Sequence, residues 1–375
     1  MSLPKSSFFL LGPRGTGKST WVRAVLPEAH FIDLLDEARY QRYLSDPGSF
    51  AMELAARPRG STVIVDEIQR LPGLLNEIHR AIEGRRLRFA LTGSSARKLR
   101  RGGTNLLGGR ALELSMFPFV PEELAEHFST DSALERGTLP LIWASEEPER
   151  SLEAYARTYL KEGIQAEALV RNLPGFSRFL PVAALFHGQV INVASLARDA
   201  GVARTTIDGF LAILEDTLIA QRLPACESRL RVRERRHPKL YFFDPGVART
   251  LKRRSGAVLG DERGSLLEGF VLGMLRFYMA HRGLADEVRY WAPADAKHTE
   301  VDFVLTRGSE LLAIEVRSAK NVRASDFVGL KAIAALPGLT RRVLVYAGEV
   351  ELRGPDSIEV WPVETLSQKL ARSEV

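Results

Sequence analysis

Residues Gly12 to Ser19, GPRGTGKS, have the types and spacing of a phosphate-binding loop. The apolar run Phe8 to Leu11 predicts a buried strand before the loop, and Trp21 to Leu26 predicts a helix after it. Glycines allow a tight turn whose N–H groups face inward, and the positive end of the helix adds to this anion cradle. In this context Lys18 is expected to reach the terminal phosphates of a nucleotide, and the Ser19 hydroxyl to hold Mg²⁺.

A pair of carboxylates ends the next apolar run, Thr62 to Glu67 (TVIVDE). Ligands of parallel sheets sit at the carboxyl ends of the strands, so Asp66 and Glu67 are expected at the same edge as the loop. Asp66 is then placed to hold Mg²⁺ through its water shell, and Glu67 to orient and deprotonate an attacking water. The alternative is that the pair only caps a following helix, and the loop at Gly12 argues against it.

Hydroxyl residues follow a further predicted strand, Arg88 to Leu91. Thr92 and Ser94 are both candidates to contact the γ-phosphate or the attacking water, and the sequence does not choose between them. A helix N-cap at Ser94 or Ser95 is an equal alternative. The residues expected to contact nucleotide are Gly12, Pro13, Arg14, Gly15, Thr16, Gly17, Lys18, Ser19, Thr20, Thr92 and Ser94.

Arg110 follows a basic, glycine-rich stretch and precedes a predicted strand, Ala111 to Leu114. A flexible glycine loop would let this arginine swing to a phosphate as an arginine finger, and a solvated arginine is equally compatible with the spacing. The remaining elements predicted here are a strand over 30–34 and helices over 36–44 and 49–56.

Four segments together resemble a known family: GPRGTGKST, VIVDEIQRLPG, LTGSSARKL and LLGGRALELSMFPF. They look like the bacterial and archaeal AAA-type ATPases that end in the domain of unknown function 4143, and the resemblance extends over nearly the whole chain. It implies a five-stranded ATPase core with Lys18, Ser19, Asp66 and Glu67 in the roles given above. It also implies that Arg110 senses nucleotide, either in its own chain or from a neighbour.

Composition bounds the remaining possibilities. The chain has 375 residues, long enough for two or three domains, and a net charge of +6 that favours a polyanionic partner. Its single cysteine, Cys226, allows no internal disulfide and fits a reducing cytoplasm, where we expect the protein to reside. No apolar stretch approaches the ~20 residues that span a bilayer, so we expect no membrane partner.

A helix-turn-helix is predicted around Gly201, between helices at Val193 to Ala200 and Ala203 to Leu214. The second helix begins with residues that could face DNA, because recognition helices present their N-terminal residues. The strands of a wing are predicted at Leu218 to Leu223 and Arg229 to Arg235, the latter with alternating arginines on one face. The residues expected to contact DNA are Arg204, Thr205, Thr206, Arg229, Arg231 and Arg233. The alternative is a packing module whose arginines form a solvated edge. The family implies a winged helix at this position.

A second acidic constellation lies near the end of the chain. Asp302 and Glu315 fall on two strands predicted to pair, with Glu268 on a preceding helix, which is the arrangement that holds Mg²⁺ in restriction-endonuclease-like folds. Arg317 stands where that pattern has a lysine, and arginine stays protonated and cannot act as a base. We therefore expect a degenerate site, with structural ion pairs as the alternative.

The sequence predicts an α/β protein in three parts. Residues 1–128 form a P-loop ATPase core with a parallel sheet, residues 129–255 a helical segment and winged helix-turn-helix, and residues 256–375 a restriction-endonuclease-like domain. The predicted function is hydrolysis of ATP with Mg²⁺, coupled to conformational change or movement on DNA by a homo-oligomer, possibly a ring. The alternatives are a nucleotide-controlled signalling switch and an active metal-dependent nuclease.

Overall fold

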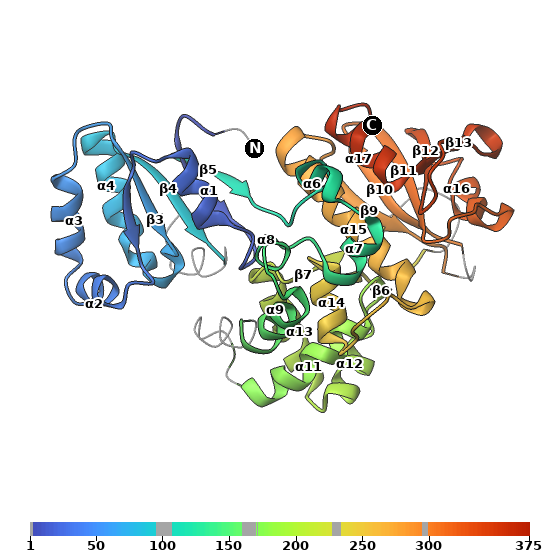
Figure 1. The fold of residues 1–375 in the computed structure, drawn as a ribbon, viewed down its shortest axis with the longest axis horizontal. Helices are drawn as coiled ribbons and strands as arrows, with labels where there is room; N and C mark the ends of the chain where they lie inside the picture. Colours follow the sequence, from blue (N-terminus) through green and yellow to red (C-terminus); the bar gives the residue numbers. More distant parts are fainter. Residues whose placement is uncertain (1–2, 95–106, 160–169, 171, 227–233, 295–298) are drawn as a thin grey trace. The chain divides into compact units, whose positions relative to one another are not determined.

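The computed structural model describes residues 3–94, 107–159, 170, 172–226, 234–294 and 299–375 (Figure 1). The chain divides into two compact units, which are described separately below. The first consists mainly of Met1–Phe117, and the second mainly of the residues from Pro118 onward.

The first unit is built on a five-stranded parallel sheet with the order β2-β3-β4-β1-β5. Its strands are β1 (Ser7–Leu11), β2 (His30–Asp33), β3 (Thr62–Asp66), β4 (Arg88–Gly93) and β5 (Ala111–Ser115). The three central strands, β1, β3 and β4, are apolar runs buried on both faces, as expected for a parallel sheet. The predicted α/β class with a parallel core is confirmed.

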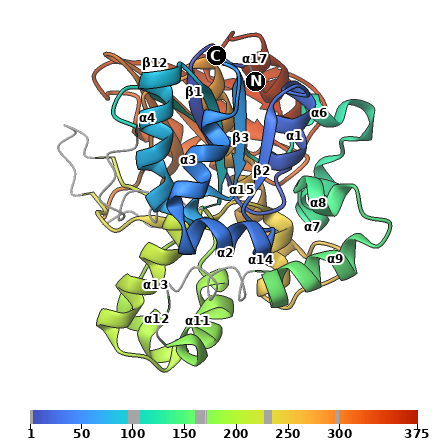
Figure 2. The ribbon, with the colours of Figure 1, turned by 90° about the vertical axis from the view of Figure 1, so that its left-hand side faces the viewer.

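Helices cover both faces of this sheet (Figure 2). The helices are α1 (Lys18–Val25), α2 (Glu37–Ser45), α3 (Pro47–Ala55) and α4 (Leu75–Arg85). Phe50 and Ile78 belong to a core with Phe9 and Leu11, whereas Val22 of α1 packs with the alternate strand residues such as Phe8. This alternation along β1 places α1 on one face and α2, α3 and α4 on the other.

The carboxyl ends of β1, β3 and β4 meet at one edge, which is where the glycine loop begins. The Gly12 N–H donates to the Gly93 carbonyl (3.3 Å), and the Met116 N–H donates to the Leu11 carbonyl (2.7 Å). A Cβ on Gly12 would collide with the main-chain oxygen of Met116. The chain therefore needs glycine where it leaves β1 between its two neighbours.

The second unit begins with short helices and a small antiparallel sheet. The helices are α6 (Pro121–Leu124), α7 (Thr130–Arg136), α8 (Pro140–Trp143), α9 (Pro148–Ala154), α11 (Leu173–Leu185), α12 (Val193–Ala200), α13 (Arg204–Asp216) and α14 (Pro245–Leu251). The sheet has the order β6-β8-β7, with β6 at Gln189–Val190, β7 at Ala220–Leu223 and β8 at Lys239–Phe242.

The strands predicted for the wing are Leu218 to Leu223 and Arg229 to Arg235. The first appears as β7, whose antiparallel partner in the described part of the chain is β8, with Ala220 opposite Phe242. Residues 227–233 lie outside the described part of the chain. Just after them, Glu234 bridges to Pro293 and the Arg235 N–H donates to the Ala292 carbonyl (3.0 Å).

A six-stranded mixed sheet completes the second unit, in the order β13-β14-β12-β11-β10-β9. Its strands are β9 (Glu287–Trp291), β10 (Val301–Arg307), β11 (Glu310–Arg317), β12 (Leu339–Tyr346), β13 (Leu352–Arg353) and β14 (Glu359–Pro362). The helices around it are α15 (Gly260–Arg282), α16 (Val328–Ala332) and α17 (Val363–Ala371). β10 and β11 form the predicted antiparallel pair, with Phe303 opposite Ile314.

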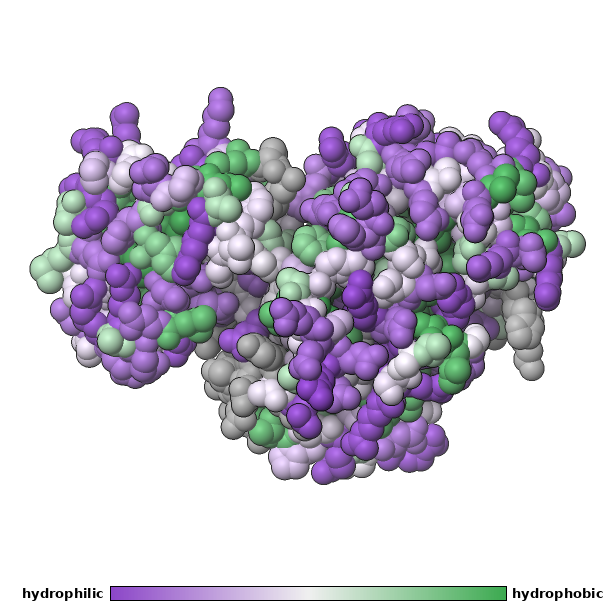
Figure 3. Space-filling view, viewed as in Figure 1, coloured by the Kyte–Doolittle hydropathy of each residue, from purple (hydrophilic) through white to green (hydrophobic). Residues whose placement is uncertain are grey.

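Hydrophilic side chains cover most of the surface in the view of Figure 3, and hydrophobic ones form small separate patches. None of the described helices combines the length and the apolar composition needed to cross a membrane.

Candidate functional site

The glycine loop folds around its own lysine. Gly15 and Gly17 have φ of 81° and 83°, a left-handed conformation that favours glycine. Lys18 is buried, and its Nζ donates to the carbonyls of Gly12 and Pro13 (both 2.8 Å). No side chain of the described residues caps the N-terminus of α1, so its first N–H groups stay available to an anion. The loop has the donors of a phosphate cradle.

Three oxygen-bearing side chains converge beside that loop. The Ser19 hydroxyl donates to Asp66 Oδ1 (2.9 Å), and the Thr92 hydroxyl donates to the same carboxylate oxygen. They come from the start of α1 and the ends of β3 and β4. Hydroxyl and carboxylate oxygens are the ligands that Mg²⁺ takes, usually with several waters, so this donor set fits the expected ion.

Glu67 is held in an unusual backbone conformation, with φ 58° and ψ 42°. Its N–H donates to the Thr92 hydroxyl (3.2 Å), and its carboxylate accepts a hydrogen bond from the side-chain amide of Gln69. That amide also donates to Ser94 Oγ (3.1 Å). The two hydroxyls between which the sequence did not choose thus have different places: Thr92 touches Asp66, whereas Ser94 is joined to Glu67 through Gln69.

Gln69 was not singled out from the sequence. It follows Glu67 by two positions, and its polar side chain lies in a buried one-turn helix, Ile68–Arg70. The sequence signal for it was weak: a polar residue two positions after the acidic pair, followed directly by the charged Arg70.

Arg110 lies at the other edge of the sheet. Ala111 is aligned with Ser7 at the start of β1, whereas the glycine loop follows Leu11 at its end. At about 3.3 Å per residue, the length of β1 separates them by on the order of 13 Å. The Arg110 guanidinium pairs with Glu83 and donates to the Gly108 carbonyl (3.2 Å). In this structure Arg110 is turned away from the loop of its own chain.

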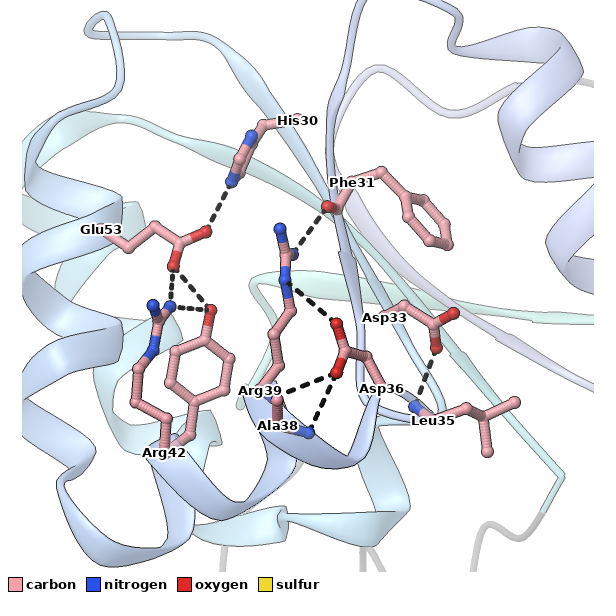
Figure 4. Close-up of polar contacts among 10 residues, drawn as sticks. His30, Phe31, Asp33, Leu35, Asp36, Ala38, Arg39, Arg42 and Glu53 are labelled. Atoms are coloured by element: carbon pink, nitrogen blue, oxygen red, sulfur yellow. Dashed lines mark hydrogen bonds and ion pairs between the residues drawn. The ribbon is translucent and has the colours of Figure 1, made fainter.

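A polar cluster at the sheet edge organises β2 with α2 and α3 (Figure 4). Glu53 accepts from Tyr43 Oη (2.6 Å), lies 2.8 Å from His30 Nε2 and pairs with Arg42. Asp33 is aligned with Asp66, but its carboxylate accepts the Leu35 N–H (2.8 Å) and so shapes the turn after β2. We assign this cluster a structural role.

The second acidic constellation also comes together. The Asp302 N–H donates to Glu315 Oε2 (3.2 Å), the Val316 N–H donates to Asp302 Oδ2 (2.9 Å), and Tyr241 Oη donates to Glu268 Oε2 (3.0 Å). Asp302 and Glu315 are fully buried. Adjacent strands β10 and β11 and helix α15 therefore bring together the carboxylates predicted to do so.

Two cations of the chain fill this cluster. Lys239 Nζ lies 3.2 Å from Asp302 Oδ1, 3.4 Å from Glu300 Oε1 and 3.6 Å from Glu268 Oε2. Arg317 pairs with Glu315 and lies 3.5 Å from Asp326 Oδ1. Among the described residues, no group of three or more acidic, histidine or cysteine side chains is arranged to hold a metal ion. Lys239 was not predicted from the sequence.

The cluster holds more carboxylates than cations, and this excess of negative charge shifts the pKa values of its members. Burial and the nearby Asp302 raise the pKa of Glu268 to about 8, although Lys239 lowers it. Burial likewise raises the pKa of Glu315 well above its ordinary value. Burial alone would lower the pKa of Lys239, but the surrounding carboxylates outweigh it and raise that pKa well above its ordinary value. These carboxylates already have a resident cation.

The predicted DNA-facing residues lie in the first turn of α13. Arg204 and Thr205 are exposed and Thr206 is half-buried, after the left-handed Gly201 that ends α12. Asp208 is exposed one turn further along the same helix. Arg229, Arg231 and Arg233 lie outside the described residues.

Comparison with known families identifies both ends of the chain. Residues 5–125 match the family described as "AAA domain". Residues 263–366 match the domain of unknown function 4143, and residues 128–257 the domain of unknown function 8612. The chain is an AAA-domain protein with a C-terminal domain of unknown function 4143. The AAA domain contains the glycine loop and the acidic pair, and the C-terminal domain contains Glu268, Asp302 and Glu315.

Similar proteins give little further guidance on function. Uncharacterized proteins of Mycobacterium tuberculosis and Mycobacterium bovis are each 26% identical over 370 residues, covering 95% of this chain and 80% of theirs. A structure of the Aeropyrum pernix ORC1 protein with DNA has 15% identity and a TM-score of 0.26, covering 67% of this chain and 87% of that one. Protein VC1899 of Vibrio cholerae has 13% identity and a TM-score of 0.24, covering 98% and 97%. The structural similarities are too low to support an argument.

Proposed function

We propose that this AAA-domain protein is a Mg²⁺-dependent ATPase that couples ATP hydrolysis to work on DNA. The observation that carries the proposal is the contact between Ser19 and Asp66, 2.9 Å between hydroxyl and carboxylate oxygen. It joins the glycine loop to the acidic pair at the carboxyl edge of a parallel sheet, where ligands of such sheets bind.

The residues of this edge divide the work of in-line water attack. Lys18 exchanges its two loop carbonyls for phosphate oxygens, and Glu67 accepts the proton of the attacking water. Ser19 and Asp66 would hold Mg²⁺, with Thr92 supporting Asp66. An ion bound there would neutralise charge on the phosphates.

The decisive test compares ATP hydrolysis by the wild type, Lys18→Ala and a control, Lys5→Ala. Lys5 is an exposed lysine of the same domain. We expect Lys18→Ala to lower kcat by about 100-fold or more, because it removes the main cation facing the phosphates, and Lys5→Ala to leave it unchanged. Equal activity in all three proteins would remove the catalytic assignment.

We propose that α12, α13 and the β6-β8-β7 sheet act as a winged helix that contacts DNA. The order of elements and the exposed Arg204 at the start of α13 support this, together with the net charge of +6. Steady-state ATPase activity with and without duplex DNA, over a salt series, tests the coupling. DNA-stimulated turnover that falls steeply with salt is expected.

The exposed Asp208 favours a second candidate function, a nucleotide-controlled switch that does not use DNA. A carboxylate on the outer face of a recognition helix would be repelled by phosphates, which leaves only the first turn for DNA. Turnover that does not respond to DNA at any salt concentration would favour this second candidate. We do not propose nuclease activity, because Lys239 and Arg317 already neutralise the carboxylates that it would need.

We propose that Arg110 acts on the nucleotide of a neighbouring copy. Its position at the opposite edge of the sheet from its own loop supports this. Mixing Arg110→Ala with Lys18→Ala tests the proposal, since one variant keeps the loop and the other keeps the arginine. Recovery of activity on mixing two inactive proteins is expected, and an additive result would contradict it.

A further inference from the structure

Gln69 is a buried polar residue that has no role in the ATPase mechanism proposed above. Its side chain is 2% exposed, and its amide nitrogen donates to both the Glu67 carboxylate and Ser94 Oγ. A Cβ on Gly93 would lie 2.7 Å from Gln69 Oε1. Glycine at the end of β4 thus leaves the room that this amide occupies.

The other end of the same amide is not satisfied. Gln69 Oε1 is buried and has no hydrogen-bond partner among the described residues. Buried polar atoms without partners are uncommon in folded proteins, and each calls for a physical reason. A residue that served only to fill space at this position would fit better as an apolar side chain, so the contact made by the nitrogen must matter.

The Gln69 amide nitrogen contacts the Glu67 carboxylate, the group that has to be oriented to accept a proton. Glu67 is fixed at its backbone by the N–H to Thr92, but its carboxylate can still rotate about the side-chain bonds. Among the described residues, the hydrogen bond to that carboxylate comes from Gln69. Ser94, a candidate to contact the γ-phosphate, is the second acceptor of the same amide.

We propose that Gln69 is a positioning residue, which orients the Glu67 carboxylate by linking it to Ser94 at the end of β4. This inference rests on the proposed ATPase function. Gln69 itself does not touch the reacting atoms. The link connects the proton acceptor that follows β3 with Ser94, which follows β4 and is a candidate to contact the terminal phosphate.

The test is a double-mutant cycle on single-turnover ATP hydrolysis. Gln69→Leu is expected to lower kcat by about 10- to 100-fold, the effect of losing a hydrogen bond to a charged group, with nucleotide affinity changed by less than about twofold. In a Glu67→Gln background, Gln69→Leu is expected to have no further effect, because the group it positions is gone. Gln41→Leu, on an exposed glutamine of α2, serves as the control.

The outcomes separate the two proposals. If the wild type hydrolyses ATP in a Lys18-dependent way and Gln69→Leu has the same kcat, this inference alone is overturned. Equal losses in both backgrounds, or a loss explained by weaker nucleotide binding, also overturn it by showing a merely structural role. Wild-type protein without Lys18-dependent hydrolysis overturns both proposals. Gln69→Met, which keeps the length of the side chain, gives the same comparison if the leucine variant does not fold.

Discussion

Replacing Lys239 with methionine should destabilise the second unit severely. Methionine keeps the length of the side chain but removes the ammonium that faces Asp302, Glu300 and Glu268. Lys239 is 2% exposed, so water cannot easily take over its role. The substitution leaves buried carboxylates without their cation, which is the most costly way to break an ion pair.

The magnitude follows from the three distances. Each contact of 3.2–3.6 Å between two full charges corresponds to about 5 kcal/mol of attraction at an effective dielectric constant of 20. The contact with Glu268, whose pKa is about 8, reaches this value only when that carboxyl is ionised. Desolvation of the buried ammonium offsets much of this sum, and removal of one partner of a buried pair typically costs about 3–5 kcal/mol. We expect a loss in that range from the free energy of unfolding.

The loss should also depend on pH. Burial already raises the pKa of Glu268 to about 8 in the presence of Lys239, so without the lysine this carboxyl holds its proton more tightly still. A group whose pKa is raised on folding contributes stability at low pH and loses it as the pH rises through the folded value. The difference between Lys239→Met and wild type should therefore be larger at pH 9 than at pH 6.

Urea unfolding followed by tryptophan fluorescence measures this effect. Trp291 and Trp361 are buried in the second unit and report on its unfolding. Lys331→Met is the matched control, because Lys331 is exposed and its ion pair with the exposed Asp356 is a long contact of 3.9 Å. Loss of this surface pair should change the free energy of unfolding by less than about 0.5 kcal/mol. A stability of Lys239→Met within that margin of wild type at pH 9 would refute the reasoning.

Three further predictions concern other parts of the chain. Burial lowers the pKa of His187 to about 3, so between that pH and the ordinary pKa of 6.5 the unfolded chain binds one more proton than the folded chain. The folded state therefore loses stability as the pH falls from 6.5 towards 3. His187→Gln should flatten the slope of unfolding free energy against pH in this range by about 1.4 kcal/mol per pH unit. Equal slopes in both proteins would contradict this. Gly12→Ala should lower the free energy of unfolding by about 1–3 kcal/mol, because the new Cβ meets the main-chain oxygen of Met116. Gly84→Ala in α4, where the Cβ has open space, should raise it by about 0.5–1 kcal/mol. Thermal unfolding compares the two variants, and an unchanged stability of Gly12→Ala would contradict the close contact after β1. Arg204→Ala should lower the slope of log affinity against log salt for duplex DNA by about 0.9, the effect of losing one phosphate contact, and an unchanged slope would remove Arg204 from the interface.

Much of the first unit could be predicted because its signals are local. Continuous apolar runs identified the parallel strands, and the loop Gly12 to Ser19 with the pair at Asp66 located the edge where they meet. Helix α4 was not predicted, although Leu75 and Ile78 have helical spacing, because the stretch before it reads as turns around Pro72 and Gly73.

The second unit could be predicted less well, since its organisation depends on contacts between distant residues. The alternating arginines before Pro238 predict a strand of the wing that lies mostly outside the described residues, whereas the pairing of β7 with the apolar β8 was not predicted. Nothing in the local pattern shows that Lys239 enters a cluster with Asp302, which is 63 positions away. Periodicity predicts that a strand exists, but it does not identify the strand with which it pairs.

The sequence separation between Arg110 and the glycine loop does not reveal that they lie at opposite edges of the sheet. In a parallel sheet, residues before a strand and residues after a strand lie at different edges, whatever their separation in sequence. Arg110 precedes β5, whereas Ser19, Asp66 and Thr92 all follow or end their strands. Under the proposal that Arg110 acts on the nucleotide of a neighbouring copy, the catalytic set is completed between two chains, and we therefore expect ATP hydrolysis to depend on protein concentration.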